Sequence, residues 1–156
     1  MSMRILTELT TKLVEEKSGD EVPKSEVFMN GTPTGKLVSG AIMEAAVQWE
    51  DFYLLFMTDD TPYEEMLGIH LFDKNWNLLD AALLGGIYSS GSFSAIELNE
   101  PNTISFGFIG DAIWTIELLS HPSFRVPFIS DGEGVKRPLG FSRHFIVRGN
   151  PRPQTA

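Results

Sequence analysis

The fold is decided by one stretch of the sequence, Thr103-Ile104-Ser105-Phe106-Gly107-Phe108-Ile109-Gly110-Asp111-Ala112-Ile113-Trp114-Thr115-Ile116-Glu117-Leu118-Leu119. On either side of its Gly-Asp-Ala centre, apolar residues alternate with polar or small ones. Successive side chains of a strand point to opposite faces, so a period of two is typical of strands with one buried face. The stretch therefore predicts a β-hairpin. The side chains predicted to face its core are Ile104, Phe106, Phe108, Trp114, Ile116 and Leu118.

The length of the turn decides whether those side chains meet. A two-residue turn would place the two apolar stripes on opposite sides of the sheet, because a shift of one residue reverses every side chain. A three-residue turn instead pairs Phe108 with Trp114 and Phe106 with Ile116. We predict this register, or a longer turn of the same parity.

A third strand is predicted just before the hairpin. Ile96 and Leu98 alternate with polar neighbours, and a five-residue connection places Leu98 opposite Ile104 and Ile96 opposite Phe106. Three strands would then share one apolar face. Each Phe, Ile or Leu that is fully buried there contributes about 1.5 to 3 kcal/mol.

Further strands are predicted over residues 52–58, 66–72, 78–84 and 143–148. Residues 52–57 are apolar at every position, which is typical of a strand in the middle of a sheet. Residues 41–49 are rich in alanine and fit either a strand or a helix. The Asp- and Asn-containing residues 73–77 predict a turn, and Ser120-His121-Pro122 is predicted to end the sheet.

The N-terminal residues 4–16 place Leu6, Leu9 and Leu13 at helical spacing, with a strand as the competing interpretation. We therefore predict one β-rich α+β domain. It would be a curved antiparallel sheet or partly closed β-barrel of about seven to nine strands with a short N-terminal helix. Its expected parts are a helix and loop (1–25), a sheet core (26–119) and a basic C-terminal segment with a frayed end (120–156).

The composition of the 156 residues narrows the function classes. There is no cysteine, and no apolar run approaches the roughly 20 residues that a transmembrane helix needs. We expect a cytoplasmic protein that neither enters a membrane nor carries a cofactor or metal ion. Residues 30–37, Asn-Gly-Thr-Pro-Thr-Gly-Lys-Leu, lack the spacing and the final Ser or Thr of a phosphate-binding loop, so they predict a turn.

Charge is distributed unevenly along the chain, whose net charge is −9. Residues 1–60 contain 5 basic and 11 acidic side chains, and residues 61–120 contain 1 and 8. Residues 121–156 contain 6 basic and 2 acidic side chains. Nucleic-acid binding needs clustered Lys and Arg, so we expect none through the acidic sheet body. An acidic surface instead favours a basic partner.

The leading hypothesis for function is a non-catalytic protein that binds a basic macromolecule, in the manner of inhibitor or immunity proteins. Trp is favoured at interface hot spots, although a Trp at a turn also commonly packs back on its sheet. The residues predicted to bind such a partner are Asp59, Asp60, Glu64, Glu65, Asp73 and Trp76. The sequence leaves the oligomeric state open.

A small-ligand site inside the barrel or cupped sheet is the alternative hypothesis. Arginine binds carboxylate and phosphate groups through paired hydrogen bonds, and aromatic residues would line the cavity. The residues predicted for this site are Arg125, Arg137, Arg143, Arg148 and His70. An enzyme is the third hypothesis; no residue is assigned a catalytic role, and His70 with Asp73 or Asp80 would be the first place to look.

Overall fold

The computed structural model describes residues 3–14, 23–59, 66–85, 93–108, 113–123, 135–137 and 143–150. Within these ranges the regular structure is all β-strand, so none of them contains a helix that could cross a membrane. The predicted α+β class with a short N-terminal helix is therefore wrong. The described part of the chain is all-β.

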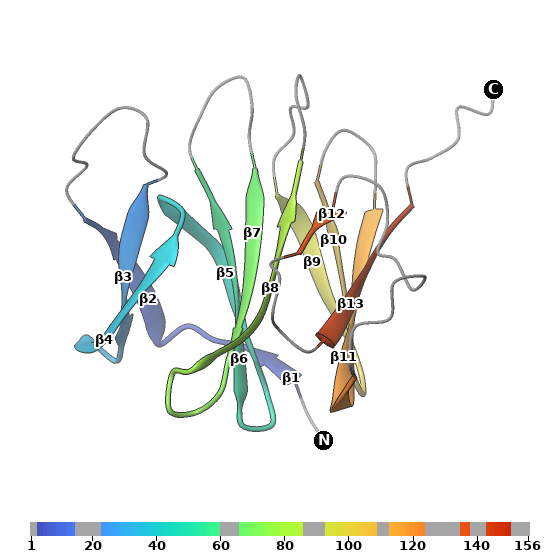
Figure 1. Ribbon diagram of the computed structural model, residues 1–156, viewed down its shortest axis with the longest axis horizontal. Helices are drawn as coiled ribbons and strands as arrows, with labels where there is room; N and C mark the ends of the chain where they lie inside the picture. The colour runs from blue at the N-terminus through green and yellow to red at the C-terminus, as the bar shows by residue number, and fades with distance from the viewer. Residues whose placement is uncertain are drawn as a thin grey trace.

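The strands are β1 (Met3–Ile5), β2 (Leu9–Leu13), β3 (Lys24–Met29), β4 (Thr32–Ser39), β5 (Ile42–Trp49), β6 (Phe52–Thr58), β7 (Leu67–Phe72), β8 (Leu78–Leu84), β9 (Ser94–Asn99), β10 (Thr103–Gly107), β11 (Ile113–Ser123), β12 (Val135–Lys136) and β13 (Arg143–Asn150). They form three antiparallel sheets. The central sheet has the order β1-β5-β6-β7-β8-β12, the C-terminal sheet β13-β11-β10-β9 and the N-terminal sheet β2-β3-β4. Figure 1 shows the central sheet between the other two.

Two cores join these layers. The large core lies between the central and C-terminal sheets, and its aromatic members are Trp49, Phe56, Phe106, Phe108, Trp114 and Phe145. The small core lies between the central and N-terminal sheets and consists of Leu6, Leu9, Val27, Val38, Ala46, Leu55, Met57 and Phe72. The predicted single curved sheet or partly closed β-barrel is wrong, because the described strands belong to three separate sheets.

Strand β6 explains the three layers. Leu54 and Phe56 belong to the large core, whereas Leu55 and Met57 belong to the small core, and all four are buried. A strand with apolar side chains on both faces needs a covering layer on each side. Its predicted position in the middle of a sheet is confirmed, since β6 lies between β5 and β7.

The hairpin β10–β11 has the predicted parity but a longer turn. Phe106 pairs with Trp114 and Ile104 pairs with Ile116, so the apolar side chains share one face as expected. The pairings of Phe108 with Trp114 and of Phe106 with Ile116, predicted for a three-residue turn, are therefore wrong, and the register is that of the second alternative, a longer turn of the same parity. The indole N–H of Trp114 donates to the carbonyl oxygen of Phe108 at 3.0 Å, which satisfies its buried polar group.

The pairing of β9 with β10 is predicted correctly at one end only. Leu98 pairs with Ile104 as expected, but the register shifts between Ser105 and Gly107, so Ile96 does not pair with Phe106. Gly107 allows close approach there, because an added Cβ would lie 2.9 Å from the hydroxyl oxygen of Ser94. Such β-bulges are a common use of glycine within strands.

The N-terminal residues form strands β1 and β2, so the competing strand interpretation is the correct one. Leu6 and Leu9 are both buried in the small core, whereas Leu13 is 49% exposed and lies on no common helical face with them. The helical spacing arises because the chain bends at residues 7 and 8, between the two strands. Pairing of β1 with β5 and of β2 with β3 outweighs a weak local preference for helix.

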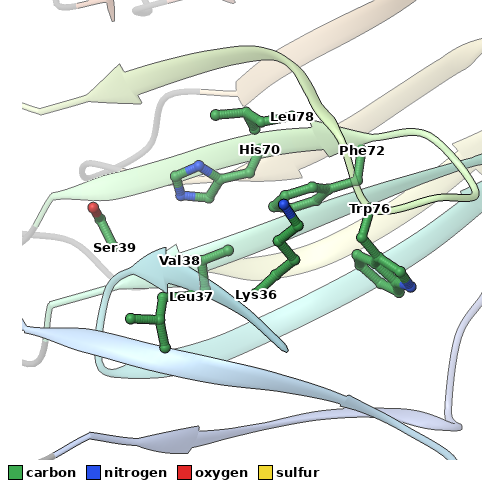
Figure 2. A pocket seen from close by; sticks show the side chains of 8 residues that line it. All are labelled: Lys36, Leu37, Val38, Ser39, His70, Phe72, Trp76 and Leu78. Atoms are coloured by element: carbon green, nitrogen blue, oxygen red, sulfur yellow. The ribbon is translucent and has the colours of Figure 1, made fainter. Parts of the chain in front are cut away.

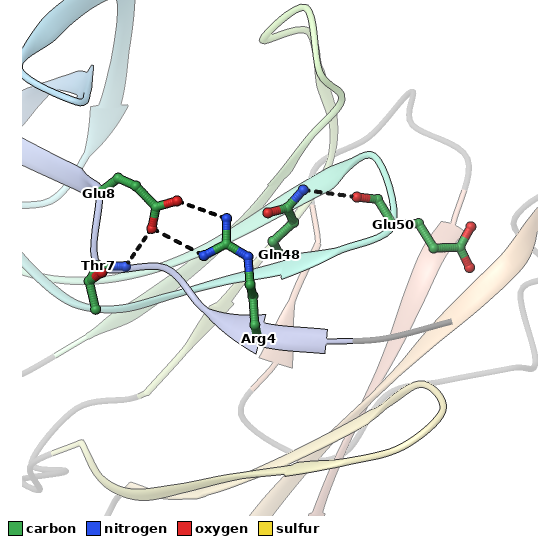
Figure 3. A network of polar contacts seen from close by, with 5 residues as sticks. All are labelled: Arg4, Thr7, Glu8, Gln48 and Glu50. Carbon is green, nitrogen blue, oxygen red and sulfur yellow. Dashed lines mark hydrogen bonds and ion pairs between the residues drawn. The ribbon is translucent and has the colours of Figure 1, made fainter.

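A polar network holds this bend, as Figure 3 shows. The Arg4 guanidinium donates to both carboxylate oxygens of Glu8, at 3.2 and 2.8 Å, and the Thr7 amide donates to the same carboxylate at 3.0 Å. The hydrogen bond from Arg4 lowers the pKa of Glu8 to about 2. The Asn30 amide donates to the Glu8 carbonyl at 2.8 Å, so the network links the entry of β2 to the β3–β4 turn.

Several other predictions are confirmed. Residues 42–49 form strand β5 rather than a helix, and β7 and β8 follow as predicted, joined by the turn at residues 73–77. Of residues 30–37, for which a turn is predicted, only Asn30 and Gly31 form one, at φ 53° and 80°, the left-handed pair that a type I′ hairpin turn requires. The prediction is wrong from Thr32 on, where strand β4 begins.

The predicted end of the sheet at residues 120–122 is wrong, because β11 continues to Ser123, which pairs with Arg143. An irregular register between Leu118 and Ser123 accommodates Pro122, which has no N–H to donate. The predicted last strand is confirmed as β13. The frayed end predicted for the C-terminal segment lies, from residue 151 on, outside the described ranges.

Candidate functional site

A pocket of about 280 Å³ lies between β4 of the N-terminal sheet and β7–β8 of the central sheet. It is lined by Lys36, Leu37, Val38, Ser39, His70, Phe72, Trp76 and Leu78, which Figure 2 shows from close by. Leu37 and Leu78 are 52% and 39% exposed, so apolar surface continues from the pocket to its rim. Pockets of this kind, mostly apolar with a few polar groups, are the usual sites for small ligands.

Strand β4 supplies one wall of the pocket and pairs with β3 along its other edge. Val38 is buried in the small core, whereas its neighbours Leu37 and Ser39 are exposed. The register of β4 against β3 shifts between Glu26 and Phe28, near Gly35, whose φ of 81° suits glycine. This irregularity sets the path of the strand beside the pocket.

The β7–β8 turn supplies Trp76. The Asp73 carboxylate accepts hydrogen bonds from the amides of Asn75 and Asn77, at 2.8 and 2.9 Å, and from the Asn77 side chain at 3.0 Å. Burial opposes ionisation of Asp73, but these hydrogen bonds and the charge of Lys36 together lower its pKa. These hydrogen bonds within the β7–β8 turn therefore fix its conformation.

Trp76 packs back onto the central sheet. Its backbone has a φ of 65°, and its ring stacks on Tyr53 at 4.8 Å between centroids and lies 5.4 Å from Phe72. The side chain is half-buried. Of the two interpretations of this Trp, the structure therefore has the packed one, and the side chain also lines the pocket (Figure 2).

His70 is one of the polar residues that line the pocket, on the strand that faces β4. Alternate residues of β7, Leu67, Ile69 and Leu71, belong to the large core, so His70 faces the N-terminal sheet. Gly68 leaves room for the imidazole, because an added Cβ there would lie 2.9 Å from His70 Nε2. The ring therefore has a fixed place between Gly68 and β4.

The Nε2 atom of His70 is buried and has no hydrogen-bond partner among the described residues. Burial lowers the pKa of His70 to about 4, and a hydrogen bond with the Ser39 backbone opposes that shift. The imidazole is thus neutral near pH 7. A neutral imidazole presents one donor and one acceptor, so a polar partner at Nε2 is the missing element of the site.

Asp80, named with His70 as the first place to look for an enzyme site, does not lie beside it. Asp80 lies on the opposite face of the central sheet, where the Arg137 guanidinium donates to its carboxylate and the His144 amide donates to it at 2.8 Å. Both side chains are buried, at 0% and 5% exposure, and Arg137 also lies 4.4 Å from the Phe145 ring centroid. This ion pair joins β8 and β12 to the C-terminal sheet, which is a structural role.

The remaining predicted arginines lie apart from the pocket lining. Arg148 pairs with Glu117 across β13 and β11 at 2.8 Å, and Arg143 lies at the start of β13. Arg125 is outside the described residues. Of the arginines predicted for the ligand site, none that the structure describes lies beside His70. Lys36 supplies the positive charge of the pocket instead.

The predicted acidic partner surface is described in part. Asp60, Glu64 and Glu65 lie outside the described residues, and Asp59 is half-buried at the end of β6. Asp73 uses its carboxylate within its own turn. Within the described ranges, no group of three or more His, Asp or Glu side chains is placed to hold a metal ion.

Sequence reasoning missed one wall of the pocket. Lys36 and Leu37 end the segment 30–37 that predicts a turn, Ser39 follows it, and nothing in their pattern marks them as binding residues. His70 and Trp76 were named for two different sites, but the structure places them in one. Comparisons with protein-family models, with curated proteins and with solved structures give no match for this chain.

Proposed function

We propose that this protein is a non-catalytic binding protein and that it holds a small ligand in the pocket between β4 and the β7–β8 turn. The observation that carries the proposal is the pocket lined by Phe72 and Trp76 beside His70, whose buried Nε2 has no hydrogen-bond partner in the described part of the chain. An unpaired buried polar group costs about 1 to 3 kcal/mol. A ligand that supplies the missing hydrogen bond recovers that cost.

Four one-ring or branched probes test the proposal: benzoate, phenol, benzylamine and isovalerate. Each is added to ¹⁵N-labelled protein, and amide shifts are followed in ¹H–¹⁵N spectra. We expect at least one probe to give saturable shifts centred on residues 36–39, 70 and 76. A Ser39→Trp substitution should reduce them, because the new ring would extend from an exposed position at the pocket wall.

The matched control is Thr10→Trp, which adds the same ring at an exposed position of β2, a strand that contributes nothing to the pocket lining. This variant should bind like the native protein. Absence of saturable shifts with all four probes, shifts centred elsewhere, or shifts unaffected by Ser39→Trp would each rule out this site.

Binding of a basic protein partner in the cytoplasm is a second candidate function. The supporting observation is the negative charge of residues 1–120, which contain 19 acidic and 6 basic side chains. Opposite charges speed association, and the effect declines with salt. In this proposal the acidic residues of the β6–β7 connection and the turn residues Asp73 and Trp76 contact the partner.

Charge reversal at Glu64 and Glu65 tests this candidate, with lysozyme as the basic protein probe. The double substitution to Lys should slow association and weaken its salt dependence. Substitution of Glu97 and Glu100, two exposed residues on and beside β9, gives the same change of net charge at another place. Equal effects of the two double substitutions would show that only the total charge matters and would exclude a specific acidic surface.

A further inference from the structure

We infer that the pocket selects a small aromatic carboxylate with a hydroxyl group at the end opposite the carboxylate. This inference rests on the proposed ligand-binding function and names the ligand class. Three properties of the lining support it: its single charge, its apolar rings and branched side chains, and the buried Nε2 of His70, which has no partner among the described residues. Each fixes one part of the ligand.

The charge of the lining fixes the anionic part. Lys36 is the only charged side chain among the eight lining residues, which include no carboxylate. Lys36 is exposed, forms no ion pair among the described residues and extends across the pocket towards Phe72 in Figure 2. Asp73 lies near enough for the charge of Lys36 to lower its pKa, but its carboxylate already accepts three hydrogen bonds within its own turn. Lys36 is therefore placed to bind a ligand anion.

The apolar lining and the volume fix the body of the ligand. Phe72, Trp76 and Leu78 line the central-sheet side, and Leu37 and Val38 line the side of β4. A volume of 280 Å³ corresponds to roughly nine water molecules at about 30 Å³ each. One aromatic ring with two small substituents fits that space, whereas a fused multi-ring ligand would extend into solvent.

His70 fixes the polar end. Its Nε2 is buried and has no hydrogen-bond partner among the residues that the structure describes, and the neutral ring offers either a donor or an acceptor at that atom. A hydroxyl group both donates and accepts, so it can pair with either tautomer. A second carboxylate would pay for desolvation without a cation to compensate it, because Lys36 is the one charge in the lining.

Three probes separate these contributions in calorimetric titrations: 4-hydroxybenzoate, benzoate and 4-hydroxybenzyl alcohol. We expect 4-hydroxybenzoate to bind most tightly. Loss of its hydroxyl group should weaken binding by about five- to tenfold, the size of one net hydrogen bond, and loss of its carboxylate by about two- to fivefold, the size of an exposed ion pair. Because the chain has a net charge of −9, a preference for an anion has to come from local groups.

Two substitutions assign the preferences to residues. Lys36→Gln should abolish the preference for 4-hydroxybenzoate over the alcohol, while Lys12→Gln, an exposed lysine on β2, should leave it unchanged. His70→Phe should abolish the preference for 4-hydroxybenzoate over benzoate. Amide spectra of each variant show whether it is folded. If His70→Phe does not fold, the test of the ligand class rests on Lys36→Gln alone.

The outcomes separate this inference from the proposed function. Equal binding of the three probes, a preference for the alcohol, or a carboxylate preference that survives Lys36→Gln would overturn the ligand class while leaving a ligand-binding pocket in place. Failure of all three probes also overturns the class, and the four-probe spectra with Ser39→Trp then decide whether the pocket binds anything.

Discussion

His70 and Asp80 lie on neighbouring strands of the central sheet but face opposite layers. His70 pairs with Ala81 in the register of β7 and β8, and Asp80 pairs with Leu71. His70 therefore faces the N-terminal sheet and the pocket, whereas Asp80 faces the C-terminal sheet and Arg137. The two groups cannot act as one acid–base pair, so each is tested separately.

Substitution Asp80→Asn is expected to destabilise the protein by about 3 to 5 kcal/mol, because it leaves the buried Arg137 charge without its counter-charge. Urea unfolding at pH 7 measures the change. Glu117→Gln breaks the exposed pair with Arg148, whose side chains are 39% and 60% exposed, and should change stability by less than about 1 kcal/mol. Similar losses in both variants would contradict a structural role for the buried pair.

Acidification is expected to destabilise the fold through His70. Its ordinary pKa of 6.5 applies in the unfolded chain, whereas burial lowers the folded value to about 4. Between these values the unfolded state binds more protons, so the contribution is complete above about pH 6.5 and declines as the pH falls towards 4. The loss is at most on the order of 3 kcal/mol.

Urea unfolding of the native protein and of His70→Gln at several pH values between about 4 and 7.5 measures this effect. The variant should lose less stability on acidification. His144→Gln is the control, because burial also lowers the pKa of His144 while Asp80 opposes the shift. An unchanged pH dependence in His70→Gln would disprove the assignment.

Gly68→Ala is expected to cost about 1 kcal/mol, because the new Cβ would lie 2.9 Å from His70 Nε2 and the ring would have to move. In a His70→Ala background the same change should be neutral or stabilising, since alanine restricts the unfolded chain more than glycine does. A double-mutant cycle measures the coupling. A cost that persists without the imidazole would mean that another contact limits this position.

Gly149→Ala tests the packing of the C-terminal sheet. An added Cβ would lie 2.5 Å from Cζ3 of Trp114, and the Trp114 indole is held by its bond to the Phe108 carbonyl. Such overpacking costs about 1 to 3 kcal/mol and should vanish in a Trp114→Leu background. Gly31→Ala is the contrast: no atom lies within 4 Å, so any cost comes from its φ of 80° and should not depend on Trp114.

The period of two was sufficient to predict the strands of the middle of the chain. It fixed the parity of β10 against β11, but the turn length depends on contacts such as the bond from Trp114 to Phe108, which no local pattern encodes. The bulge at Gly107 likewise depends on how closely Ser94 approaches it. Local alternation determines which side chains share a face of the hairpin, whereas tertiary contacts determine which residues pair.

The layer arrangement and the pocket were harder to predict. The doubly apolar β6 signalled covering layers on both sides, but the sequence did not show that residues 9–39 would form one of them. Leu6 and Leu9 have the spacing of a helical face because a bend lies between them. The pocket depends on that same layer, so no local sequence pattern predicts Lys36 and Ser39 as binding residues. Of the lining residues, the sequence predicts only His70 and Trp76.

The shared position of β6 has a consequence for how the fold opens. If the N-terminal sheet detaches, Leu54 and Phe56 remain covered, and if the C-terminal sheet detaches, Leu55 and Met57 remain covered. Deuterium should therefore enter the amides of β6 only through global unfolding, whereas β2 and β4 should exchange through smaller local events. A ligand seated beside β4 would then slow exchange in β6 as well as in the N-terminal sheet, because neither the locally opened nor the globally unfolded chain holds it.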